Sequence, residues 1–273
     1  MKTALLLSGH IRNLVENYDN LKEHVLNHFQ PDVFLHTWDT YGWRAEGNDI
    51  ECGDGKFKGF DYYSGKVNQE EIVSLLNPKA YVFENFLEKE EEFLSQAKKY
   101  KSNCKHPKDR PENVVGLAYK IFKCNELKKL HEQNNNFVYD VVIRARPDIV
   151  YSEWFNKRIL SLVGSIENNT LFTPVEESYG NASDILAVGS SSTIDLLSTL
   201  YLCLEQLNTE GANMNPHHLL KMFLDQKFEP TKWFKLSFGI DLNRCRKKNL
   251  CGGNLWCNSC DPSKKILSNI SSE

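Results

Sequence analysis

Two arginines and an aspartate follow directly on an apolar run in residues 139–151, YDVVIRARPDIVY. The β-branched side chains of Val141, Val142 and Ile143 predict a central strand, because they suit a pleated surface that is covered on both faces. Pro147 has no backbone N–H to donate, so we expect the regular ladder to stop near it. The polar side chains should therefore stand at the carboxyl end of a buried strand.

These polar residues are Arg144, Arg146 and Asp148. Open α/β sheets bind ligands just outside the carboxyl ends of their strands. Two guanidiniums there could grip a diphosphate, and Asp148 could hold a divalent cation that bridges the same phosphates. The alternative is that Arg146 and Asp148 only pair with each other at the strand end. The motif alone leaves both interpretations open.

Two earlier apolar runs also end in residues that could contact a nucleotide. Ser8, Gly9 and Arg12 follow the run TALLL, where Gly9 would let a ligand approach the backbone and Arg12 could reach a phosphate. Taken alone, this SGHIR segment also fits an ordinary turn. Asp39 follows the run DVFLHTW, and carboxylates at strand ends after a βαβ unit often contact ribose hydroxyls.

The spacing of apolar residues predicts the elements that position these groups. Tyr18, Leu21, Val25 and Phe29 recur at helical spacing between the first two apolar runs, which gives a βαβ opening and a right-handed crossover. We therefore expect an α/β fold with a Rossmann-like, mostly parallel sheet flanked by helices. Further strands are expected at 80–84, 139–151, 170–173, 184–188 and 233–238, and helices at 70–76, 89–100, 114–132, 191–207 and 215–225.

Size and charge limit the possible partners. The 273 residues suit one large α/β domain or two small ones. With 33 basic and 36 acidic side chains, the net charge of −3 gives no general attraction to nucleic acid or to anionic membranes. The N-terminal apolar run is too short for a secretory signal, and no later stretch approaches the ~20 apolar residues of a membrane span. We expect a cytoplasmic protein with no membrane span and no nucleic-acid partner.

A cysteine-rich segment follows the last expected strand. The thiols of Cys245, Cys251, Cys257 and Cys260 suit a tetrahedral Zn²⁺ site, which would be structural because four protein ligands leave no open position. Reversible disulfides and free thiols remain open alternatives.

Five segments, taken in order, resemble motifs of one enzyme family. They are SGHIRN, DVFLHTWD, AYKIFKCNEL, YDVVIRARPDI and DILAVGSSSTID, and they span roughly residues 3–225. The family comprises polysaccharide glycosyltransferases of the capsule and lipopolysaccharide type, related to the WavE group. Its members carry an Arg-x-Arg-x-Asp element and also occur in large DNA viruses.

The resemblance implies a GT-A type fold that binds a nucleotide-diphosphate sugar. Such an enzyme would transfer a hexosyl or deoxyhexosyl group to a hydroxyl of a glycan acceptor, in polysaccharide biosynthesis. In that fold a carboxylate-bearing loop usually holds a metal ion against the diphosphate. Here Arg146 stands where an Asp-x-Asp motif would have its first acid, which departs from the usual metal-binding pattern. Mn²⁺ or Mg²⁺ held by Asp148 alone, with waters and the substrate phosphates, is one expectation. Neutralisation of the phosphates by Arg144 and Arg146 in the metal's place is the other.

The resemblance also suggests roles for individual residues. Asp148 and Asp184 are the catalytic candidates, Asp148 at the diphosphate and Asp184 as acceptor contact or as the base that takes the hydroxyl proton. Residues 1–244 would form the catalytic domain and residues 245–273 a separate tail. The candidate donor-binding residues are Ser8, Gly9, Arg12, Asp39, Arg144 and Arg146.

Two other functions remain as alternatives. A nucleotidyltransferase-like enzyme on a similar sheet would release pyrophosphate, and it should need more carboxylates. A non-catalytic interaction protein would instead use a zinc-binding cysteine tail. His217 and His218 follow Asn215-Pro216, a predicted helix start, and we interpret them as surface residues with an anion or acceptor contact as the alternative.

Overall fold

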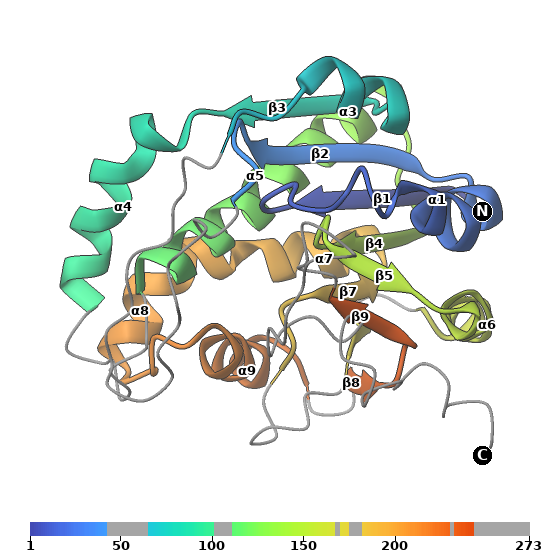
Figure 1. Ribbon diagram of the computed structural model, residues 1–273. Coiled ribbons are helices and arrows are strands. Elements are labelled where there is room, and N and C mark those ends of the chain that lie inside the picture. Colours follow the sequence, from blue (N-terminus) through green and yellow to red (C-terminus); the bar gives the residue numbers. More distant parts are fainter. Residues whose placement is uncertain (43–64, 101–110, 167–169, 175–181, 230–231, 243–273) are drawn as a thin grey trace, which may run out of the picture.

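The computed structural model describes residues 1–42, 65–100, 111–166, 170–174, 182–229 and 232–242. Their main feature is a seven-stranded sheet in the order β3-β2-β1-β4-β7-β6-β8, accompanied by a two-stranded sheet of β5 and β9 (Figure 1). The strands are β1 (Thr3–Ser8), β2 (Asp32–Trp38), β3 (Ala80–Glu84), β4 (Val141–Ala145), β5 (Ile149–Tyr151), β6 (Leu171–Pro174), β7 (Leu186–Gly189), β8 (Trp233–Leu236) and β9 (Ile240–Leu242).

The large sheet is mostly parallel. The neighbours β3, β2, β1 and β4 all run in one direction, while β7 lies antiparallel to both β4 and β6. The order β3-β2-β1 is that of one Rossmann half, and β4 lies on the other side of β1. In such sheets ligands bind where the strand order reverses, here between β1 and β4. The predicted α/β, Rossmann-like sheet is confirmed.

Helices cover both faces of this sheet, which therefore forms the middle of three layers. The helices packed on one face are α1 (Tyr18–Leu21), the π-helical turn η1 (Lys22–Leu26), α2 (Asn27–Phe29), α3 (Gln69–Leu76) and α6 (Glu153–Leu162). The helices packed on the other face are α4 (Phe86–Tyr100), α5 (Pro111–Asn135), α7 (Ser191–Ser198), α8 (Leu204–Thr209) and α9 (Pro216–Lys227).

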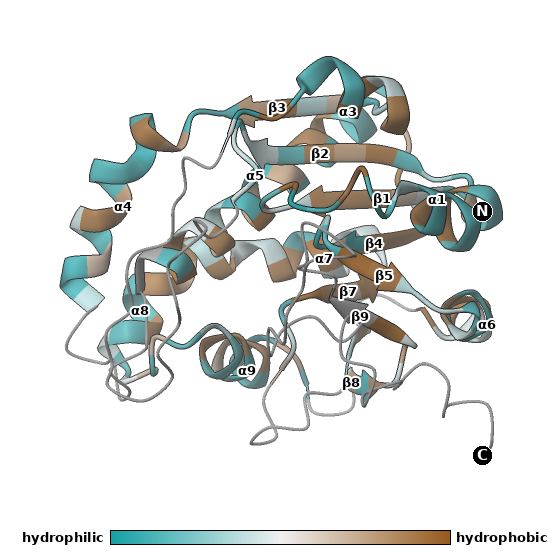
Figure 2. Ribbon diagram, in the orientation of Figure 1, coloured by the Kyte–Doolittle hydropathy of each residue, from teal (hydrophilic) through white to brown (hydrophobic). Residues whose placement is uncertain are grey.

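The two cores explain why the central strands are apolar throughout. On β1, Leu5 and Leu7 pack into the core with α1 and α6, while Ala4 and Leu6 pack into the core with α5 and α9. A strand covered on both faces has no side that tolerates polar residues. Figure 2 shows these strands as hydrophobic, whereas the outer helices carry most of the hydrophilic residues.

The structure differs from the sequence-based elements in several places. The run at 139–151 divides into β4 and β5, which belong to different sheets. The expected helix 191–207 is interrupted by the 3₁₀ segment η4 (Thr199–Cys203), where the Ser198 and Thr199 hydroxyls donate to the carbonyls of Asp195 and Leu196. Such bonds compete with the regular helical pattern. Helix α6 was not predicted.

Within the described residues, no helix has both the length and the apolarity needed to cross a membrane.

Candidate active site at the switch point of the sheet

The carboxyl ends of β1 and β4 lie side by side, as their parallel register pairs Leu7 with Ala145. Gly9 follows β1 with a φ of 122°, a conformation that residues with a Cβ rarely adopt. A Cβ added at Gly9 would lie 3.8 Å from Cδ of Pro147. The SGHIR and RARPD segments, more than a hundred residues apart in sequence, therefore meet at one point of the sheet edge.

Arg12, Arg146 and Asp148 form an ion-pair group at this point, called here the arginine cluster. Nη1 of Arg12 lies 2.6 Å from Oδ2 of Asp148. Arg146 binds the same carboxylate with two bonds, Nε to Oδ1 at 2.9 Å and Nη2 to Oδ2 at 2.7 Å. Asp148 is fully buried, while the arginine side chains are 19% and 13% exposed. One buried carboxylate thus fixes two guanidiniums that still reach solvent.

Formal charges of +2 and −1 leave the arginine cluster with a net charge of +1. Burial lowers the pKa of Arg12, although Asp148 opposes the shift. For Arg146 burial acts in the same direction, but the charges of Asp148 and Asp184 outweigh it and raise the pKa. Arginine stays protonated in proteins. The cluster therefore offers positive charge to an anion.

Arg12 also has an unusual backbone. Its φ is 45°, in the left-handed region, and its N–H donates to the Tyr41 carbonyl at 3.1 Å. Residues with a Cβ occupy this region only where the surroundings hold them there, and such positions gather at functional sites. The backbone aims the Arg12 side chain at Asp148.

Arg144 lies behind the arginine cluster and is fully buried. Its Nε donates to Oγ of Ser8 at 2.9 Å, and its Nη1 donates to the Asp184 carbonyl. Burial lowers the pKa of Arg144 to about 10 despite the nearby charge of Asp184. Nη2 has no hydrogen-bond partner among the described residues. Arg144 lines a cavity of about 20 Å³ with Ser183 and Asp184, which is enough room for one water molecule.

Asp184 precedes β7 and lies beside the end of β4, since the N–H of Arg146 donates to the Ile185 carbonyl at 3.0 Å. Oδ1 of Asp184 is 3.7 Å from Nδ1 of His217, at the start of α9. Nδ1 of His217 is also 3.1 Å from the Ala182 carbonyl oxygen. The predicted cap is confirmed, because the Asn215 side chain accepts from the N–H of His217.

Asp39 lies one strand away, at the end of β2. Its N–H donates to the Glu84 carbonyl at 2.8 Å, and its carboxylate pairs with Lys66, an exposed residue. The structure thus brings together Ser8, Gly9, Arg12, Arg144, Arg146, Asp148 and Asp184 through direct contacts, with Asp39 at the neighbouring strand end. Cys245, Cys251, Cys257 and Cys260, and with them the predicted zinc site, lie outside the described residues.

The residues around Asp148 do not fit a metal site as they are arranged. Both carboxylate oxygens accept hydrogen bonds from guanidiniums, and two positive side chains would face the cation. Within the described ranges, no group of three or more His, Cys, Asp or Glu side chains could hold a metal ion. The Mn²⁺ or Mg²⁺ expected at Asp148 stays a prediction.

His10 is a residue that the sequence analysis did not single out. Burial, together with the charges of Arg12 and Lys120, lowers its pKa to about 3. A Cβ at Gly42, whose φ is 71°, would lie 2.2 Å from the His10 ring. This glycine therefore lets the backbone after β2 pack closely on a neutral imidazole beside Arg12. The only hint in the sequence was that His10 stands two residues before Arg12.

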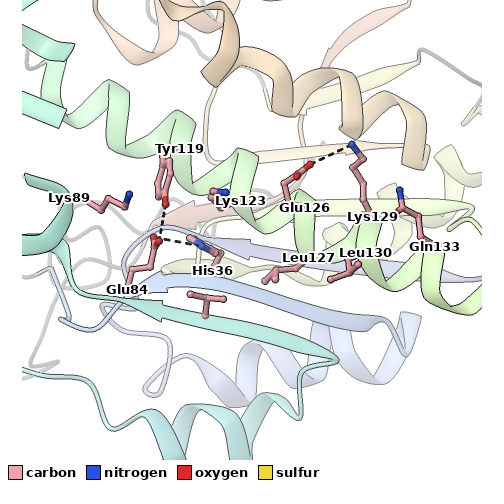
Figure 3. Close-up of a pocket in the computed structure, with 11 residues that line it drawn as sticks. His36, Glu84, Lys89, Tyr119, Lys123, Glu126, Leu127, Lys129, Leu130 and Gln133 are labelled. Carbon is pink, nitrogen blue, oxygen red and sulfur yellow. Dashed lines mark hydrogen bonds and ion pairs between the residues drawn. The ribbon is translucent and has the colours of Figure 1, made fainter. Parts of the chain in front are cut away.

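A groove of about 530 Å³ lies on a different flank, between α5 and the β2–β3 edge of the sheet (Figure 3). At one end, the Glu84 carboxylate accepts from the Tyr119 hydroxyl at 2.8 Å and from Nζ of Lys120 at 2.6 Å. We call Glu84, Tyr119 and Lys120 the lysine cluster. Nζ of Lys120 lies 3.3 Å from the ring centroid of Trp38, and burial lowers the pKa of Lys120 to about 7. None of the residues of the arginine cluster lines this groove.

No protein-family model and no curated protein matches this chain. Among solved structures, it is similar to apo mouse xyloside xylosyltransferase 1, at 8% identity and a TM-score of 0.42, over 86% of this chain and 84% of that chain. It is also similar to a cytidylyltransferase from Leptospira borgpetersenii serovar Hardjo-bovis, at 12% identity and a TM-score of 0.33, over 87% of this chain and 76% of that chain. The functional proposal therefore rests on the side chains.

Proposed function

We propose that this protein is a glycosyltransferase that uses a nucleotide-diphosphate sugar and transfers the sugar to a hydroxyl of a glycan acceptor. The observation that carries the proposal is the convergence of Arg12 and Arg146 on Asp148, at the switch point between β1 and β4. This is where open α/β sheets bind nucleotides, and two fixed guanidiniums suit a diphosphate.

The charge of the cluster matches the chemistry. As the bond between sugar and diphosphate breaks, negative charge grows on the leaving nucleoside diphosphate. Cations already aimed at that charge lower the barrier, and removal of one such donor typically costs ~3–4 kcal/mol. Arg12 and Arg146 would supply these donors, while Asp148 keeps their charge and geometry in place.

The remaining residues would orient the substrates. Gly9 would let the diphosphate approach the backbone, and Asp39 would accept from the ribose hydroxyls. Arg144 is a positioning residue in this proposal, because its buried side chain joins Ser8 to the Asp184 carbonyl. The Asp184 carboxylate would face the acceptor.

Calorimetry and thermal shift with a panel of nucleoside diphosphates and their sugars, each with and without Mn²⁺, test the proposal. A donor at one hundred times its dissociation constant should stabilise the protein by about 2.7 kcal/mol. Incubation with the binding donor and glycan acceptors should then release the nucleoside diphosphate. Pyrophosphate release from a nucleoside triphosphate would identify the nucleotidyltransferase alternative instead. If no nucleotide binds, the remaining hypothesis is the non-catalytic interaction protein with a zinc-binding tail.

A further inference from the structure

The first turn of α9 presents a histidine whose backbone and ring are both held in place. Asn215 caps the helix by accepting from the N–H of His217 at 3.1 Å, and Pro216 occupies the first helical position. At the ring, Nδ1 lies 3.1 Å from the Ala182 carbonyl oxygen and 3.7 Å from Oδ1 of Asp184. The helix start and the segment before β7 together fix the ring.

These contacts determine which ring nitrogen carries the proton. A carbonyl oxygen and a carboxylate oxygen can only accept, so Nδ1 of His217 must be the donor. In the neutral imidazole the lone pair then lies on Nε2. This tautomer is assigned from the hydrogen-bond partners. An oriented imidazole with an acceptor behind Nδ1 and its lone pair on Nε2 is an arrangement that enzymes use for proton abstraction.

His217 is connected to the arginine cluster through Asp184. Ile185, the residue after Asp184, accepts at its carbonyl from the N–H of Arg146 at 3.0 Å, and the charge of Asp184 raises the pKa of Arg146. The Asp184 side chain is 10% exposed, whereas that of His217 is 34% exposed. A hydroxyl that approaches from solvent therefore meets the imidazole more readily than the carboxylate.

We infer, on the basis of the function proposed above, that His217 is the proton acceptor for the glycan hydroxyl and that Asp184 is its positioning residue. The hydroxyl oxygen of the acceptor forms a bond to the anomeric carbon while its proton moves to Nε2 of His217. The bond from the anomeric carbon to the diphosphate oxygen breaks, and its electron pair stays on the nucleoside diphosphate beside Arg12 and Arg146. The resulting imidazolium is stabilised by Asp184 and later returns its proton to water.

The decisive variant is His217→Asn, because the asparagine amide can still donate to the Ala182 carbonyl but has no equivalent of Nε2. General-base catalysis contributes ~10²–10⁴-fold, so kcat should fall at least about a hundredfold while the donor dissociation constant changes less than about twofold. The matched control is His218→Asn on the same helical turn, whose kcat should stay within about twofold of the wild type.

Two further variants separate chemistry from structure. His217→Ala opens space for added imidazole, which should restore a measurable part of kcat if the lost group is a proton acceptor. Asp184→Asn keeps the imidazole, so it should lower kcat less than His217→Asn, and added imidazole should not restore it. His217→Asn with kcat within threefold of the wild type overturns the inference, and so does His217→Ala that binds donor but gains nothing from imidazole.

The same experiments separate this inference from the proposed function. If the wild-type protein binds donor and transfers sugar while His217→Asn does so equally well, the transferase stands and His217 is not its base. If the wild-type protein binds no nucleoside diphosphate and transfers no sugar, the proposed function fails, and the role of His217 fails with it.

Discussion

The arginine cluster and the lysine cluster both bury charged groups near the carboxyl ends of strands, but they differ in the charge that remains. In the lysine cluster the charge of the protonated Lys120 cancels that of Glu84, and the Tyr119 hydroxyl donates to the same carboxylate. In the arginine cluster two guanidiniums share one carboxylate and reach solvent. Burial and ion pairing alone therefore do not identify a binding site.

Location strengthens this contrast. The arginine cluster stands between β1 and β4, where the strand order reverses, whereas the lysine cluster joins α5 to the outer strands β2 and β3. Shifted pKa values occur in both clusters and in structural ion pairs generally. A net positive charge at the switch point therefore indicates a binding site more selectively than a shifted pKa does.

The largest effect is expected from Asp148→Asn. It leaves two guanidiniums without their common carboxylate, so sugar transfer should fall by at least about a hundredfold, and the free energy of unfolding should fall by ~3–5 kcal/mol. Denaturant titration and a transfer assay measure the two effects. Asp140→Asn is the control, since its carboxylate accepts from the backbone N–H of Lys2 in an exposed position. An unchanged unfolding curve for Asp148→Asn would show that the ion pairs do not hold the cluster together.

Arg12→Lys should impair binding with less effect on folding. Lysine keeps the charge but loses the planar fork, so donor affinity should drop by about 10- to 100-fold, while stability changes by about 1 kcal/mol or less. Isothermal calorimetry measures the affinity. The control is Arg158→Lys, an exposed arginine whose Nε donates to the Ser237 carbonyl at 3.1 Å. Equal affinity of Arg12→Lys and the wild type would remove Arg12 from the donor site.

Lys120→Met tests whether the lysine cluster supports folding and not catalysis. Glu84 loses an ion-pair partner that is also a hydrogen-bond donor, so the free energy of unfolding should fall by ~1–3 kcal/mol. Transfer activity should stay within about threefold of the wild type. Loss of transfer in a variant that is still folded would mean that the lysine cluster belongs to the active site.

The most gradual effect is a change of stability with pH. Because the pKa of Lys120 is lowered to about 7 in the folded protein, the unfolded chain binds more protons than the folded one between about pH 7 and the ordinary lysine value of about 10.5. Stability from this group should rise with pH in that window, by up to ~1.4 kcal/mol per unit, and should not change below pH 7. Denaturant midpoints at pH 7, 8 and 9 should rise less for Lys120→Met than for the wild type. If the midpoints of the two proteins changed equally with pH, the lowered pKa of Lys120 would be contradicted.

The bounds of β2 and β3 were predicted from the sequence without error, and the meeting of Gly9, Arg12 and Asp148 followed from the expectation of a parallel sheet. Carboxyl ends of parallel strands share one edge, so residues after such strands must be neighbours. The antiparallel direction of β7 was not predictable, because a strand buried on both faces has the same apolar pattern in either direction.

The sequence by itself thus determined most of the elements and which edge of the sheet carries the polar residues, since both depend on short-range periodicity. Only the tertiary structure decided that Arg144 is buried against Ser8 while Arg146 stays at the edge with Asp148. It also decided that His217 meets Asp184, 33 residues earlier in the chain. These contacts depend on how α9 and β7 pack against β4, and no local pattern encodes the packing of elements that are distant in sequence.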